Sequence, residues 1–83
     1  MADIKYEVLK EIMVLSAESE KENAFHVEVN LISWNGSKPK LDIRRWDRYR
    51  QKMGKGISLS LDDAETILGA AEEIWEAIRG SEH

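Results

Sequence analysis

The 83-residue chain has no cysteine, which excludes disulfide bonds and thiolate chemistry. Histidine is also scarce, because only His26 and the terminal His83 are present. Neither histidine belongs to a metal-ligand spacing, and the sequence has no complete phosphate-cradling glycine motif and no nucleophile paired with a base. We therefore expect a protein that is not an enzyme and that uses neither a metal ion nor another cofactor.

Long apolar runs are missing as well. No stretch approaches the ~18 apolar residues of a membrane-spanning helix, and residues 1–5 lack the basic and apolar regions that begin a signal peptide. These absences lead us to expect a cytoplasmic protein without membrane contact. The length allows one domain over residues 1–83, and the small core of so short a chain makes oligomerisation an expected source of further burial.

Charge is abundant but unevenly placed, because the net charge of −4 combines two regions of opposite sign. Residues 34–56 hold eight lysines and arginines against only Asp42 and Asp47, whereas the remainder holds four cations and fourteen anions. Trp34 and Trp46 lie within the basic stretch. Cations interleaved with aromatic rings are typical of a surface that binds an anionic polymer with stackable faces.

The apolar pattern predicts four strands followed by one helix, an α+β fold. Residues 4–16, 25–34, 40–48 and 57–59 are expected to be strands, because apolar residues partly or fully alternate along them. Alternation breaks at Val8-Leu9 and over residues 12–15, which predicts a first strand that is bulged or buried on both faces. Asn35-Gly36 predicts a turn, residues 17–24 a polar connection or a short helical turn, and residues 49–56 a cationic loop. Ser60 is placed to cap the helix and Gly80 to end it.

The predicted helix carries an apolar stripe that is broad for one helix over one small sheet. Such a stripe favours packing of this helix against the same helix of a second subunit. The residues expected at this dimer interface are Ile67, Leu68, Ala71, Ile74, Trp75 and Ile78.

Alternation along the two middle strands separates two faces of the sheet. One face gathers aliphatic side chains, and the other carries polar, cationic and indole groups, including Trp34 and Trp46. Indole rings on a solvent-facing sheet can stack on unpaired bases, and neighbouring cations can hold phosphates. The residues predicted to contact nucleic acid are Trp34, Lys38, Lys40, Arg44, Trp46, Arg48, Lys52 and Lys55.

Two other interpretations of the same residues stay open at this point. Tryptophans among arginines can simply cover an exposed sheet through cation–π contacts, worth about 0.5–1 kcal/mol each. The face could also bind a protein partner, with the acidic helix surface as a recruiting element.

The order of motifs resembles a known family. Leu41-Asp-Ile-Arg-Arg-Trp46, then Lys52-Met-Gly-Lys-Gly-Ile-Ser-Leu59, then an acidic-capped helix, is similar to the single-stranded-DNA-binding domain of the transcriptional positive cofactor 4 (PC4) family. Over residues 4–78 the chain looks most like the bacterial YdbC-type branch of that family, through Ser33-Trp-Asn, Pro39-Lys and Lys52-Met-Gly-Lys-Gly-Ile.

The resemblance implies a curved, antiparallel four-stranded sheet followed by one helix, a homodimer formed through the helices, and channels for single strands. It assigns Arg44 and Lys55 to the family's basic positions, and Trp46 and Trp34 to its aromatic ones. It also implies a nucleoid-associated protein that binds single-stranded DNA with tolerance for sequence, and transcription or replication proteins as further partners. An RNA-binding variant is the alternative that the same chemistry permits.

Overall fold

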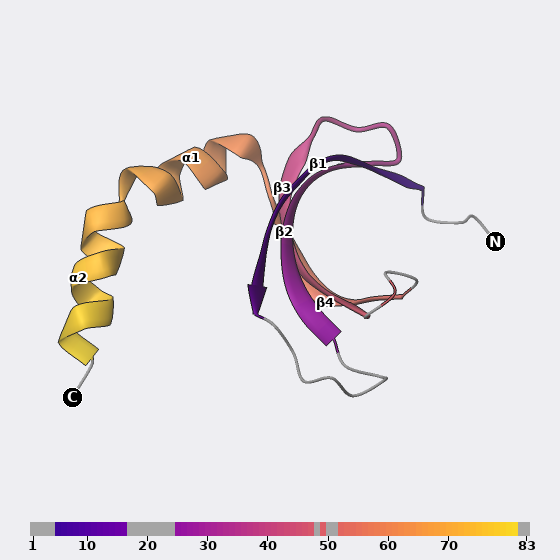
Figure 1. Cartoon of the computed structure of the whole chain (residues 1–83). Helices are drawn as coiled ribbons and strands as arrows, with labels where there is room; N and C mark the ends of the chain where they lie inside the picture. Colours follow the sequence, from indigo (N-terminus) through magenta and orange to yellow (C-terminus); the bar gives the residue numbers. More distant parts are fainter. Residues whose placement is uncertain (1–4, 17–24, 48, 50–51, 82–83) are drawn as a thin grey trace.

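The structure is a computed structural model, and it describes residues 5–16, 25–47, 49 and 52–81. Four strands, β1 (Tyr6–Ser16), β2 (Phe25–Trp34), β3 (Lys40–Asp47) and β4 (Met53–Leu59), form one antiparallel sheet in the order β1-β2-β3-β4. Two helices follow, α1 (Leu61–Gly69) and α2 (Ala71–Ser81). The predicted four-stranded antiparallel sheet is confirmed, and Figure 1 shows that it is open and strongly curved. The predicted polar connection over residues 17–24 lies outside the described residues.

Three irregularities in β1 contribute to this curvature. Its register against β2 shifts between Val8 and Lys10, between Glu11 and Met13, and between Val14 and Ser16. Each shift inserts an extra residue on one strand, which bends the strand and increases its twist. By contrast, β2 and β3 pair without interruption from Phe25↔Asp47 to Ile32↔Lys40. A regular central pair with an irregular edge strand gives the sheet a concave and a convex face.

Directly paired residues of antiparallel strands point to the same face. Trp34 pairs with Tyr6, Asn30 with Asp42, and Asp42 with Ser58, so these side chains share one face. Side chains from strands two apart also meet on this face: the Tyr6 ring contacts Trp46, and Trp34 bonds to Ser58. Only inward curvature brings such distant strands together, so this is the concave face.

The turn after β2 is as the sequence predicts. Asn35 and Gly36 both have positive φ values, 51° and 74°, which asparagine and glycine tolerate better than other residues. The backbone N–H of Asn35 donates to the carbonyl of Lys5 at 2.7 Å, and the Asn35 side-chain oxygen accepts from the Lys5 N–H at 3.0 Å. The turn is therefore tied to the residue before β1.

The last strand is longer than the sequence indicates. The prediction of a loop over residues 49–56 is wrong in its second half, because β4 begins at Met53. The two glycines do not interrupt this strand but permit it to approach β3. A Cβ added at Gly56 would lie 2.6 Å from the Arg44 Cβ and 2.6 Å from the Ile43 carbonyl oxygen. Only glycine fits there without displacing β3.

Two helices stand where the sequence predicts one. The cap is confirmed, because the Ser60 hydroxyl accepts a hydrogen bond from the Asp63 N–H at 3.1 Å. The helical path breaks at Ala70, whose φ of −100° and ψ of 17° are not helical, directly after Gly69. Glycine costs about 1 kcal/mol in a helix interior, which favours a break at this point. Gly80 does not end the second helix, which continues to Ser81.

Within the described chain, most buried residues of the sheet lie on the concave face, and Val29 is buried on the convex face. Ile32, Trp46, Asn30 and Asp42 are almost fully enclosed, whereas aliphatic residues of the convex face such as Ile57 remain exposed. The expectation that the polar and aromatic face is the free one is therefore wrong for its centre. Curvature crowds the concave side chains against one another, and the convex face has no comparable cover within the described chain.

The helices leave much apolar surface unpaired. Figure 1 shows α1 and α2 on the convex side, standing away from the sheet. Within the described part of the chain, α1 contacts β3 and β4, whereas α2 contacts α1 alone. All of the residues predicted at the dimer interface are exposed in the single chain: Ile67, Leu68, Ala71, Ile74, Trp75 and Ile78. No described helix is long and apolar enough to cross a membrane.

Candidate nucleic-acid interface

An aromatic cluster lies on the concave face. The Tyr6 ring from β1 contacts Trp34 of β2 at a centroid distance of 5.7 Å and Trp46 of β3 at 5.9 Å, both in tilted orientations. These three rings form a continuous aromatic surface across β1–β3. Tilted contacts at such separations are favourable arrangements for aromatic pairs.

The three rings differ in access to solvent. Trp46 is only 1% exposed, so the prediction that its ring projects into solvent is wrong. The Tyr6 ring from the edge strand contacts it. Trp34 is half-buried, and Tyr6 is 41% exposed. Tyr6 and Trp34 thus present the accessible aromatic surface, and Trp46 supports it from below.

Trp34 is held by polar contacts as well as by Tyr6. Its indole Nε1–H donates to the Ser58 hydroxyl at 2.9 Å, and that hydroxyl donates to Asp42 Oδ2 at 2.6 Å. The guanidinium carbon of Arg44 lies 5.2 Å from the centroid of the Trp34 ring, within cation–π range. Residues from β2, β3 and β4 therefore meet around one indole.

Arg44 is not a freely mobile cation. Its Nε donates to Asp42 Oδ1 at 3.1 Å, its Nη2 to Asp42 Oδ2 at 3.0 Å, and its Nη1 to the Gly54 carbonyl at 3.2 Å. The Arg44 side chain is 17% exposed and Asp42 is fully buried. Each Nη carries two N–H groups and uses one of them in these bonds to described residues, so the second can donate to an external acceptor.

The four predicted lysines, Lys38, Lys40, Lys52 and Lys55, are all exposed. Lys38 follows the β2–β3 turn and Lys40 begins β3, where it pairs with Ile32 on the concave side. Lys52 precedes β4, and Lys55 lies in the irregular stretch of β4 opposite Arg44 and Trp46. The cations thus lie toward both ends of β3. Arg48, which the sequence also predicts at the site, lies outside the described residues.

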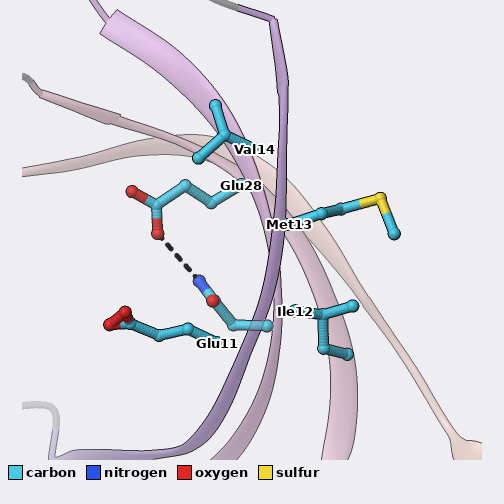
Figure 2. A pocket seen from close by; sticks show the side chains of 6 residues that line it. Glu11, Ile12, Met13, Val14 and Glu28 are labelled. Atoms are coloured by element: carbon cyan, nitrogen blue, oxygen red, sulfur yellow. Dashed lines mark hydrogen bonds between the residues drawn. The ribbon is translucent and has the colours of Figure 1, made fainter.

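The concave face is acidic toward the β1 side. A cavity of about 240 Å³ is lined by Glu11, Ile12, Met13, Val14, Glu28 and Asn30. Figure 2 shows Glu11, Val14 and Glu28 on one side of β1, with Met13 on the other. Glu28 accepts from the Asn30 amide at 3.1 Å and bonds to His26. Carboxylates disfavour phosphates here, so an anionic backbone is better accommodated near the lysines.

Tyr6 is the member of the aromatic cluster that the sequence analysis did not identify. It is an aromatic residue at the beginning of the first strand, which is the available signal. Its position beside Trp34 depends on the register of an irregular strand, and alternation cannot supply that register.

The fold and site define an α+β protein in which an open, curved antiparallel sheet carries an aromatic cluster on its concave face, with Arg44 beside that cluster. The model of the family described as Transcriptional Coactivator p15 (PC4) matches residues 21–70, more than half of the chain. The chain therefore belongs to the PC4 family, as its motifs predict.

The chain is also similar to an uncharacterized protein of Treponema pallidum (strain Nichols). The two sequences are 41% identical over 58 residues. The match covers 70% of this chain and 65% of the Treponema protein, so about a third of that relative lies outside it.

Proposed function

We propose that this protein is a homodimeric, non-enzymatic binding protein for single-stranded DNA, with little preference for sequence. The observation that carries the proposal is the accessible Tyr6–Trp34 surface beside Arg44. Exposed lysines at the beginning of β3 and on the segment that pairs with its other end add positive charge to the same sheet. Membership of the PC4 family supports binding of single-stranded DNA or a role in transcription.

In the proposed mode, bases stack on the aromatic surface of Tyr6 and Trp34. Base–aromatic stacking contributes roughly 1–3 kcal/mol per base and tolerates any sequence, because every base has a π-face. Paired bases in a duplex hide these faces, so an unpaired strand is the preferred ligand. Trp46 contributes by supporting the Tyr6 ring rather than by stacking on a base.

The phosphates of the strand would lie along the lysines. Lys38 and Lys40 serve one end of β3, and Lys52 and Lys55 serve the other. Arg44 would contribute its remaining N–H groups to a phosphate or base oxygen between them. The acidic cavity beside β1 would repel the backbone and thereby keep it on the β3–β4 side.

The exposed apolar stripe on α1 and α2 supports a dimer. Leu68 is 72% exposed, and Ile67, Ile74, Trp75 and Ile78 are also exposed although they are large and apolar. A surface of this kind is typical of a protein–protein interface. Pairing of the helices of two subunits would bury it and place two concave faces in one particle.

A cytoplasmic, nucleoid-associated role in transcription or DNA maintenance fits this binding mode. Titration of a fluorescently labelled oligo-dT tests the proposal, with the matched RNA strand and the matched duplex as competitors. We expect saturable binding of the DNA strand and weak competition by the duplex. Absence of binding near physiological salt would refute the proposal, and stronger competition by RNA would reassign the protein to the RNA-binding alternative.

A further inference from the structure

We propose that Asp42 and Ser58 are positioning residues that hold the Trp34 ring in place for base stacking. This inference rests on the proposed function. Neither residue is among those predicted to contact the strand, and Asp42 is fully buried, so it cannot itself touch a ligand in this conformation. Its effect must pass through the two side chains that it orients.

The first connection runs to Trp34 through Ser58. The Ser58 hydroxyl accepts from the indole Nε1–H at 2.9 Å and donates to Asp42 Oδ2 at 2.6 Å. A serine hydroxyl can donate only one proton, and the Asp42 carboxylate takes it. The lone pairs of Ser58 are then directed toward the indole. Asp42 therefore determines which way the hydroxyl points, and the hydroxyl fixes the angle of the ring.

The second connection runs to Arg44. Asp42 accepts from both Nε and Nη2, and the Gly54 carbonyl accepts from Nη1. These bonds define the plane of the guanidinium 5.2 Å from the Trp34 centroid. Charge-assisted contacts with two edges of a planar group are stronger and more directional than a single neutral bond. Asp42 thus constrains the ring from two directions.

This arrangement explains a buried carboxylate on a binding face. Burying a charge is costly unless it is paired and hydrogen-bonded, and Asp42 receives bonds from Arg44 and Ser58 that meet this requirement. The consequence is a partly exposed indole whose position is set before a ligand arrives. Such pre-organisation improves affinity, because less side-chain entropy is lost on binding.

The test compares Ser58→Ala with Ser58→Thr in the full chain. Ser58→Ala removes the acceptor for Trp34, whereas Ser58→Thr retains the hydroxyl and suits a strand. In the free protein, the Trp34 indole N–H, assigned by Trp34→Phe, is followed by hydrogen exchange and ¹⁵N relaxation. The affinity for oligo-dT and its salt dependence are measured on the same samples.

We expect Ser58→Ala to speed exchange of the Trp34 indole, to increase its mobility, and to weaken oligo-dT binding by about two- to tenfold, the equivalent of one lost hydrogen bond. The salt dependence should not change, because no phosphate contact is removed, and Ser58→Thr should restore the wild-type values.

The positioning role is refuted if Ser58→Ala leaves the indole as protected as in the wild type. It is equally refuted if the ring loosens but the oligo-dT affinity stays the same. Failure of the wild-type protein itself to bind oligo-dT would reject the proposed function, and the role in stacking with it. The indole measurements keep these outcomes distinct, since they need no ligand.

Discussion

The salt dependence of single-strand binding should change in discrete steps when individual lysines are removed. Lys38, Lys40, Lys52 and Lys55 are exposed near the ends of β3, and we expect each to neutralise one phosphate. Each contact with a single strand contributes about −0.7 to the slope of log K against log salt. Four contacts therefore give a slope of about −2.8.

The expected salt dependence is large enough to measure. A slope of about −2.8 corresponds to a loss of about fiftyfold in affinity between about 50 and 200 mM salt. Lys40→Gln removes one contact on the concave side, so the slope should become about −2.1 and the loss about twentyfold over the same range. Labelled oligo-dT followed by fluorescence anisotropy at several salt concentrations gives both values.

Lys10→Gln provides the matched control. Lys10 is exposed on β1 but pairs with Leu31, which places it on the convex face. Its removal changes the net charge by the same amount as Lys40→Gln, yet the slope should stay near the wild-type value. Equal changes of slope in the two variants would refute the assignment of phosphates to the concave side, because only overall charge would then matter.

Three further predictions concern stability and assembly. Trp46→Ala should lower the free energy of unfolding by about 3–5 kcal/mol in chemical denaturation, because it empties an enclosed site; a loss below about 1 kcal/mol would contradict the burial of the ring. Gly56→Ala should cost about 1–3 kcal/mol through its clash with Arg44, and should exceed Gly54→Ala, whose nearest contact is 3.3 Å; the reverse order would contradict the β3–β4 geometry. Ile74→Glu should convert the proposed dimer to a monomer in sedimentation analysis while the sheet remains folded. An unchanged mass would show that this position does not lie at the interface between subunits.

Strand positions and pairing could be predicted from the sequence where alternation is regular. Residues 25–34 and 40–47 alternate cleanly, and they form β2 and β3 without a register shift. The face to which each side chain of these two strands points could be predicted in the same way. Which face is enclosed could not be predicted, because enclosure depends on curvature. The broken alternation of the first strand indicates its bulges, but it gives neither their register nor the curvature to which they contribute.

The contrast between Trp34 and Trp46 has the same origin. Both point to the concave face, and the sequence gives no reason to treat them differently. Tyr6 from the edge strand contacts both rings, yet only Trp46 is sealed from solvent. The site residues therefore fall into an accessible pair and a support, a division that only tertiary structure defines.

Glycine positions account for two differences between the predicted and the observed secondary structure. Gly54 and Gly56 end the stretch that is predicted to be a loop, but here close approach of β4 to β3 requires them. Gly69 lies within the single helix that the apolar stripe predicts, yet the helical path breaks at the next residue. The extent of β4 and the break between the helices thus depend on close packing and on the conformational cost of glycine, rather than on the pattern of apolar residues.

In the proposed mode, an unpaired strand binds to the concave face at the aromatic surface of Tyr6 and Trp34. The three tryptophans of the chain offer a direct test, because Trp34 lies on that surface, Trp46 beneath it, and Trp75 on α2. Titration of the ¹⁵N-labelled protein with oligo-dT should shift the indole resonance of Trp34 strongly and leave that of Trp75 nearly unchanged. A shift of the Trp75 resonance without a shift of the Trp34 resonance would contradict binding at the concave face.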